Sequence, residues 1–261
     1  MTTKTKSSGA IDALVKAQTV ELKLPTVGGR FAEMADQAAR DGQPHRDYLA
    51  TLFEMELDDR SQRRAERRLH DAHFPHRKRL EDFNFEQSAV TAAQLHQLAK
   101  GDYLARAENV IFIGDSGTGK SHLATALGIA ACQQGRRVRF ITVAALVTEL
   151  QEAHELHQLG RVVRRYAGIE LLVLDELGYV QASESGAELL FQVLAERNEV
   201  ASIAVTTNLP FGEWMRVFSD PRLCKAVVDR LTFGAHIIDT GPDSWRLRRS
   251  LDRAKALKAT K

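Results

Sequence analysis

The stretch from Asn109 to Ala124, NVIFIGDSGTGKSHLA, most constrains what this chain can fold into. A short apolar and β-branched run at 109–113 is typical of a buried strand, and the run at 114–121 fits G-x-x-x-x-G-K-[ST] at every fixed position. Its glycines let the backbone turn so that N–H groups surround an anion. The helix beginning at Lys120 directs its positive end at the same anion. The stretch therefore predicts a strand, a phosphate-binding loop and a helix.

Two side chains of this loop are expected to have distinct roles. We expect Lys120 to reach the β- and γ-phosphates of a bound nucleotide and the Ser121 hydroxyl to ligate Mg²⁺. A glycine-rich turn that matches by chance is the weaker interpretation, because a strand precedes the loop and an Ala- and Leu-rich helix follows it. The residues expected to contact the nucleotide are Gly114, Asp115, Ser116, Gly117, Thr118, Gly119, Lys120, Ser121 and His122.

Two carboxylates end a second apolar run. Leu171 to Leu174 is continuously apolar and is followed by Asp175 and Glu176. A buried parallel strand brings its last residues beside the phosphate loop, so we expect Asp175 to hold the Mg²⁺ shell and Glu176 to polarise an attacking water. Acidic residues after a strand also act as helix caps, but the upstream phosphate loop favours nucleotide hydrolysis.

A fourth strand, predicted at 202–208, ends in polar residues. Its last residue, Asn208, is placed to touch the γ-phosphate or its water, although an ordinary turn asparagine before Pro210 remains the alternative. With the runs at 109–113, 138–142, 171–176 and 236–239, the chain has five predicted strands separated by helical patterns. This alternation predicts a three-layer α/β domain with a parallel sheet.

The apolar spacing of the N-terminal region predicts a small helical domain at 1–80. The α/β domain is predicted at 81–261, and residues 80–85 are expected to form a tether between the two. Five arginines in the third predicted helix recur at i, i+3, i+4, i+7 and i+8, which places them on one face. Contact with a phosphate backbone, contact with a carboxylate-rich protein and plain solvation all remain open for this face. The arginines are Arg60, Arg63, Arg64, Arg67 and Arg68, and a second cluster is Arg161, Arg164 and Arg165.

Composition narrows the class of protein. The net charge of +2 is only a weak indication of a polyanionic partner. Cys132 and Cys224 are isolated, which argues against a metal knuckle or a disulfide framework and fits a reducing compartment. No apolar run approaches the roughly 18 residues of a membrane span, and the polar start lacks the apolar core of a signal peptide. We therefore expect a cytoplasmic protein with no membrane contact.

Four segments together carry a family resemblance: GDSGTGKSHLA, LLVLDELGY, TTNLPFGEW, and VVDRL followed by SWRLRRS. They resemble the IstB group of AAA+ proteins, the ATP-binding helpers of insertion-sequence transposition, which are similar to helicase loaders of the DnaC kind. The resemblance is strong over residues 83–249 and covers the N-terminal helices in general layout only. It implies a P-loop fold of AAA+ type with sheet order 5-1-4-3-2.

The resemblance also implies roles for particular residues. Lys120 and Ser121 correspond to the phosphate and metal residues, with ATP and Mg²⁺ as ligands. The family pattern likewise makes Asp175 the Mg²⁺ partner, Glu176 the catalytic base and Asn208 the first sensor. Arg230, in VVDRL, matches the arginine finger, with a surface arginine as the alternative. Arg246, in SWRLR, matches the second sensor, although Arg248 and Arg249 are immediate competitors.

Two functions of different classes are compatible with these motifs. The first is an ATPase that assembles as a homo-oligomer on duplex DNA, largely without regard to sequence, and assists a cognate transposase. The second is a remodelling adaptor that loads a replicative helicase, in which the N-terminal helices grip a protein. A nucleotide-binding regulator without turnover is a third possibility, against which Glu176 argues.

Overall fold

The computed structural model describes residues 8–179 and 183–245. Internal contacts divide the chain into two compact units, Met1–Ala65 and Glu66–Lys261, and the division falls within helix α3. The first unit contains α1 (Ser8–Glu21), α2 (Pro25–Asp41) and the first part of α3 (His45–Asp71). Its small core joins Val27 and Phe31 of α2 to Leu52 of α3.

The second unit contains a five-stranded parallel sheet with the order β2-β3-β4-β1-β5. Read from the other edge, this is the predicted order 5-1-4-3-2, which is therefore confirmed. The strands are β1 (Val110–Ile113), β2 (Val138–Thr142), β3 (Leu171–Leu177), β4 (Ser202–Thr207) and β5 (His236–Asp239). The helices are α4 (Ala92–Ala99), α5 (Asp102–Ala105), α6 (Lys120–Gln133), α7 (Val143–Glu155), α8 (Leu159–Ala167), α9 (Glu184–Arg197) and α10 (Pro221–Thr232), with 3₁₀ turns at Leu80–Asp82, Phe85–Gln87 and Phe211–Arg216.

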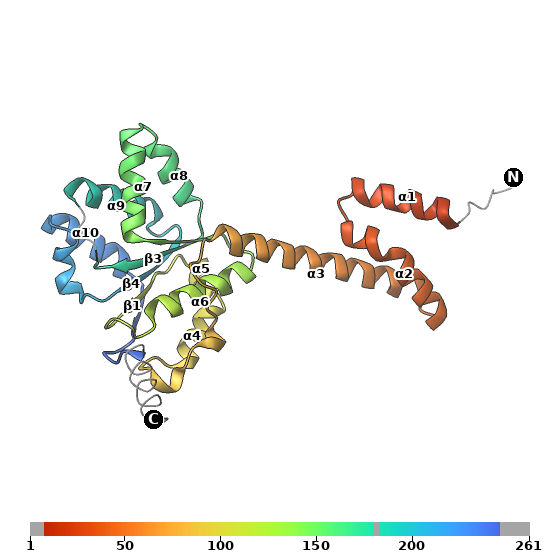
Figure 1. The fold of residues 1–261 in the computed structure, drawn as a ribbon, viewed down its shortest axis with the longest axis horizontal. Helices are drawn as coiled ribbons and strands as arrows, with labels where there is room; N and C mark the ends of the chain where they lie inside the picture. The colour runs from red at the N-terminus through yellow and green to blue at the C-terminus, as the bar shows by residue number, and fades with distance from the viewer. Residues whose placement is uncertain (1–7, 180–182, 246–261) are drawn as a thin grey trace, which may run out of the picture. The chain divides into compact units, whose positions relative to one another are not determined.

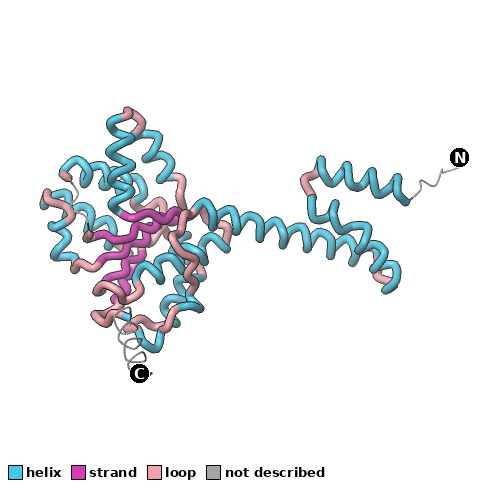
Figure 2. The backbone as a smooth tube through the Cα atoms, in the orientation of Figure 1, coloured by secondary structure: helices cyan, strands magenta, loops and turns pink. Residues whose placement is uncertain are grey.

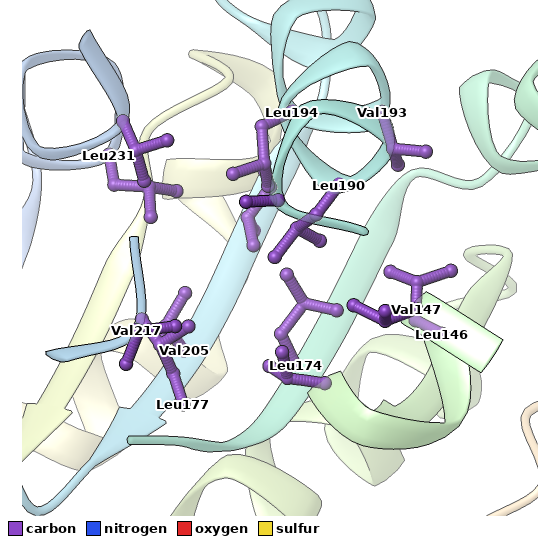
Figure 3. Packing of buried hydrophobic residues seen from close by; sticks show 14 of the residues in the cluster. Leu146, Val147, Leu174, Leu177, Leu190, Val193, Leu194, Val205, Val217 and Leu231 are labelled. Carbon is purple, nitrogen blue, oxygen red and sulfur yellow. The ribbon is translucent and has the colours of Figure 1, made fainter. Parts of the chain in front are cut away.

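The sheet lies between two layers of helices (Figures 1 and 2). Successive strand residues point to opposite faces, so Leu171 and Val173 pack toward α6 while Leu172 and Leu174 pack toward α7 and α9. Figure 3 shows the second of these cores, where Leu174 and Val205 of the sheet meet Leu190 of α9. Burial on both faces explains why the strands read as continuous apolar runs in the sequence.

Two predicted boundaries differ from the structure. The continuous helical pattern of residues 144–166, for which the sequence predicts a break near Gly160, forms two helices, and the break lies at 156–158, where His157 has a left-handed φ of 55°. The expected tether at 80–85 is instead packed against the α/β unit. Leu80 is buried, and Phe83 and Phe85 contact the core on the α6 side. The segment packs in this way because its apolar side chains are excluded from water. The prediction of a tether did not take these side chains into account.

Within residues 8–179 and 183–245, none of the helices combines the length and apolar content that crossing a membrane requires. The same residues contain no group of three or more His, Cys, Asp or Glu side chains that could hold a metal ion. Both cysteines are buried and unpaired.

Candidate functional site

A pocket of about 510 Å³ lies at the carboxyl ends of β1, β3, β4 and β5. This is the edge at which open parallel α/β sheets bind ligands. The predicted phosphate loop forms one wall, and Glu176 and Asn208 lie on others. The remaining lining residues are Lys78, Asp82, Phe83, Asn84, Glu86, Gln87, Ser88, Ala89, His122, Tyr179, Thr206, Thr207, Thr240, Gly241, Pro242, Asp243 and Trp245.

The loop has the backbone geometry that its glycines predict. Gly114, Gly117 and Gly119 have φ values of 146°, 85° and 98°, a region that other residues adopt only with strain. A Cβ atom at Gly114 would lie 2.4 Å from the Thr240 hydroxyl, and one at Gly119 would lie 2.5 Å from the Phe83 ring. Both the conformation and the close approach therefore require glycine. Helix α6 begins directly after the loop, so its unpaired N–H groups face the pocket.

The end of β5 holds the phosphate loop in place. The Asp115 amide donates to the Gly241 carbonyl at 3.1 Å, and the Thr118 and Thr240 hydroxyls share a hydrogen bond of 2.6 Å. Further along the chain, the Trp245 amide donates to the Gly117 carbonyl at 3.1 Å. These hydrogen bonds hold the backbone of the loop in one conformation, so that the loop is pre-organised for a ligand.

Lys120 and Ser121 line the pocket at the start of α6, and Ser121 contacts Asp175 of β3. The Lys120 ammonium donates to the carbonyls of Gly114 and Asp115 at 2.8 and 2.6 Å, so it lies within the curve of the loop. The Ser121 hydroxyl donates to Asp175 Oδ1 at 2.8 Å. Because its proton is used in this bond, the lone pairs of Ser121 Oγ remain for a cation. A hydroxyl and a carboxylate oxygen are ligands that suit Mg²⁺, which is held alongside phosphate oxygens in nucleotide sites.

Glu176 and Asn208 lie on the side of the pocket formed by β3 and β4. Glu176 is exposed to the pocket, and its backbone has a left-handed φ of 65°. The Oδ1 atom of Asn208 is buried and makes no hydrogen bond within the described part of the chain. This oxygen faces Gly178, where a Cβ atom would lie 2.7 Å away.

Aromatic contacts surround Phe83 of the pocket lining. Phe83 contacts Phe85 edge-to-face at 4.9 Å and His122 edge-to-face at 5.2 Å. The Nε2 atom of His122 hydrogen-bonds the Arg79 carbonyl at 2.8 Å. Because a carbonyl oxygen can only accept, Nε2 carries the proton of this bond. Burial lowers the pKa of His122 below its usual value. The segment at 79–89 is therefore attached to helix α6 beside the pocket.

One predicted nucleotide residue lies outside the pocket, and a second falls outside the described residues. Arg230 on α10 is not among the described residues that line the pocket; its guanidinium stacks on the Phe191 ring at 4.7 Å and donates to the Ala226 carbonyl at 3.2 Å. Arg246 lies outside the described residues, as do Arg248 and Arg249. A role for Arg230 at a nucleotide therefore requires the pocket of another subunit.

The arginines of α3 differ in their surroundings. Glu56, 2% exposed, accepts from Arg60 at 3.4 Å and from Arg63 at 3.3 Å, and also from the backbone amides of Thr26 and Val27 at the start of α2. Arg60 and Arg63 thus partly neutralise a buried carboxylate of the first unit while their side chains stay about half exposed. Arg64 and Arg67 are exposed, and Arg68 is half-buried. Their contact with DNA stays a prediction.

In the second arginine cluster, Arg165 forms an ion pair with Glu149 and stacks on Tyr166 at 5.1 Å. Arg161 and Arg164 are exposed on the same helix, α8. Glu149 also accepts from the Tyr166 hydroxyl at 2.5 Å, and these partners hold the pKa of this carboxylate below its usual value despite burial. The cluster is therefore partly committed to holding α7 and α8 together.

Sequence reasoning missed several residues of the pocket. The segment at 82–89 contains no motif, so nothing marked it before its packing was known. Thr206 and Thr240 had a usable signal, since each is a polar residue at the carboxyl end of a predicted apolar strand, the same place as Asp175 and Asn208. Applying that rule to every strand identifies them.

Comparison with known proteins assigns the chain to a family. The family model described as "IstB-like ATP binding protein" matches residues 17–253. This chain belongs to that family. A relative in Sinorhizobium fredii (strain NBRC 101917 / NGR234), named an insertion sequence ATP-binding protein, is 40% identical over 234 residues, which cover 89% of this chain and 78% of the relative. The ATP-binding protein named for insertion sequence IS21 of Pseudomonas aeruginosa is 34% identical over 228 residues, covering 87% of this chain and 86% of that protein.

Solved structures agree with the fold of this IstB-like chain. The AMPPCP-bound DnaA from Aquifex aeolicus superposes with a TM-score of 0.55 at 18% identity, over 70% of this chain and 56% of that one. The match spans little more than half of the DnaA chain, and at this identity it shows the fold alone. The fold is that of AAA+ P-loop proteins, as the sequence predicted.

Proposed function

We propose that this chain is an Mg²⁺-dependent ATPase that assembles on duplex DNA and assists the transposase of an insertion sequence. The observation that carries the proposal is that Lys120, Ser121, Glu176 and Asn208 line one pocket, with Asp175 hydrogen-bonded to Ser121. The names of the relatives, which refer to ATP binding and insertion sequences, support the biological setting.

The pocket residues divide the work of hydrolysis. The loop amides and Lys120 bind the β- and γ-phosphates, and Asn208 orients the γ-phosphate or the attacking water. The Glu176 carboxylate accepts the proton of that water. Ser121 and Asp175 would hold Mg²⁺, which supplies charge neutralisation between the β- and γ-phosphates when bound. The segment at 82–89 also lines the pocket, where Phe83 packs beside Gly119 and His122.

In this proposal, assembly on DNA brings an arginine of one subunit to the ATP site of its neighbour. Arg230 lies outside its own pocket, so we assign it to the γ-phosphate of a neighbouring subunit. The arginines of α3 and α8 supply phosphate contacts that do not depend on base sequence. Residues 1–80 form the region that binds DNA or the partner protein. ATP turnover then times the assembly and release of the oligomer.

The test of the chemistry is Glu176→Gln. This variant should bind ATP as the parent does, because the substituted carboxylate does not hold the phosphates. Its turnover should fall by about 10²–10⁴-fold, the usual loss when a general base is removed. Binding is measured by calorimetry with ATP, and turnover by phosphate release in the presence of duplex DNA. Hydrolysis at the parent rate would exclude Glu176 as the base.

A further inference from the structure

Thr206 lies opposite an irregularity in the sheet that contains both catalytic carboxylates. β3 and β4 pair regularly up to Leu174 and Val205, and the next pair is Leu177 and Thr207. Two residues of β3, Asp175 and Glu176, therefore face a single residue of β4, which is Thr206. This two-against-one arrangement is a β-bulge, a feature that redirects side chains next to active sites.

The bulge gives Glu176 an unusual backbone. Its φ of 65° lies in the left-handed region, which glutamate adopts only with strain. Its amide is turned out of the ladder and donates to the Thr206 hydroxyl at 3.0 Å. Without this acceptor the amide would lose its partner inside the sheet, so the Thr206 hydroxyl stabilises the strained conformation.

The same hydroxyl also reaches the metal carboxylate. Thr206 Oγ1 donates to Asp175 Oδ1 at 2.5 Å, and Ser121 Oγ donates to that oxygen at 2.8 Å. A threonine hydroxyl has one proton to donate and lone pairs to accept, so it serves Asp175 and Glu176 at once. Thr206 is 2% exposed, and the short distances leave little freedom in its rotamer.

We propose that Thr206 is a positioning residue that couples the two carboxylates of the site, orienting Glu176 through its backbone and Asp175 through its side chain. The proposal rests on the ATPase function proposed above, because it concerns how the base and the metal ligand of that reaction are aligned. Thr206 itself acts through these two residues and does not take part in the bond-making step.

The test is Thr206→Val, which keeps the shape of the side chain and removes the hydroxyl. The variant loses a hydrogen bond to the charged Asp175 carboxylate, which should raise the barrier of the reaction. Turnover should therefore fall by roughly 10–100-fold. Affinity for ATPγS without metal should stay at the parent value, since the loop that binds the phosphates is unchanged. The Mg²⁺ concentration that gives half-maximal turnover should rise, and Thr206→Ser should restore most of the rate.

Two comparisons separate positioning from loss of structure. Thr125→Val alters another buried threonine, on α6 and outside the pocket, and should leave turnover unchanged. Thr206→Val and Glu176→Gln together should lose less than the product of their separate losses, because both act on one proton transfer. Thermal unfolding of each variant shows that it is folded, and Thr206→Ala replaces the valine variant if the latter does not fold.

The outcomes distinguish this inference from the proposed function. Parent protein that binds ATP but never hydrolyses it, at any concentration and with duplex DNA present, would overturn the ATPase proposal itself. Parent turnover accompanied by an equally active Thr206→Val would overturn only the positioning role. Losses that multiply in the double variant, or a serine variant that is folded yet as slow as valine, would also overturn that role.

Discussion

Arg230 provides the sharpest test of a site shared between subunits. Its guanidinium stacks on Phe191 at 4.7 Å and lies outside the pocket of its own chain. Arg230→Ala should therefore leave ATP affinity unchanged and cost about 0.5–1 kcal/mol of stability through the lost cation–π contact. If the arginine acts on a neighbouring subunit, turnover should fall by about 10³–10⁵-fold. Lys120→Ala should be equally inactive because it loses phosphate binding.

Mixing the two inactive variants gives a quantitative expectation. In an equal mixture, a site works only where a subunit with an intact Lys120 meets a neighbour with an intact Arg230. Random assembly through a head-to-tail interface makes that arrangement at roughly one quarter of the sites. Turnover should thus return to about one quarter of the parent rate per site, a rise of more than about 10²-fold over either variant alone.

The assay is phosphate release at a protein concentration that supports assembly, with duplex DNA present and co-assembly confirmed by light scattering. Arg222→Ala, on the same helix and exposed, is the matched control and should keep the parent rate. No recovery in a mixture that demonstrably co-assembles would refute the shared site. Full activity of the parent as an isolated monomer at high dilution would refute it as well.

Three further predictions concern DNA binding, the phosphate loop and the core. Replacing Arg63, Arg64, Arg67 and Arg68 with alanine should flatten the dependence of DNA affinity on salt; an unchanged slope in binding titrations would assign these arginines to protein contact or solvation. Gly119→Ala should raise the Kd for ATP at least about tenfold, because its φ is 98° and its Cβ meets Phe83, whereas Gly160→Ala, whose Cβ would make only an ordinary contact with Arg164 at 3.6 Å, should bind normally. Arg197 is 1% exposed, and its guanidinium donates to three backbone carbonyls. Arg197→Leu should therefore lower the free energy of unfolding, measured by urea titration, by about 3–5 kcal/mol. A loss below about 1 kcal/mol would contradict this.

The core of the site was predictable from the sequence because its residues are local. The loop at 114–121 is one continuous segment, and its glycines adopt the positive φ values that the turn requires. Asp175 directly follows a continuous apolar run in the sequence. Parallel strands end at a common edge, so the alternation of strands and helices was enough to bring these segments together. The sheet order came from the family resemblance, because strand periodicity carries no information on which strands are neighbours.

What the sequence alone determined is the set of chemical groups: a phosphate loop, two carboxylates and the apolar runs that bury the sheet. Tertiary structure alone decided how these groups are held. Thr206 contacts Asp175 and Glu176 only because β4 lies beside β3 with a shifted register, and Phe83 meets Gly119 only because the segment before β1 folds back onto α6. Such contacts join residues far apart in the chain, and their geometry depends on the packing of the whole sheet, which no local pattern encodes.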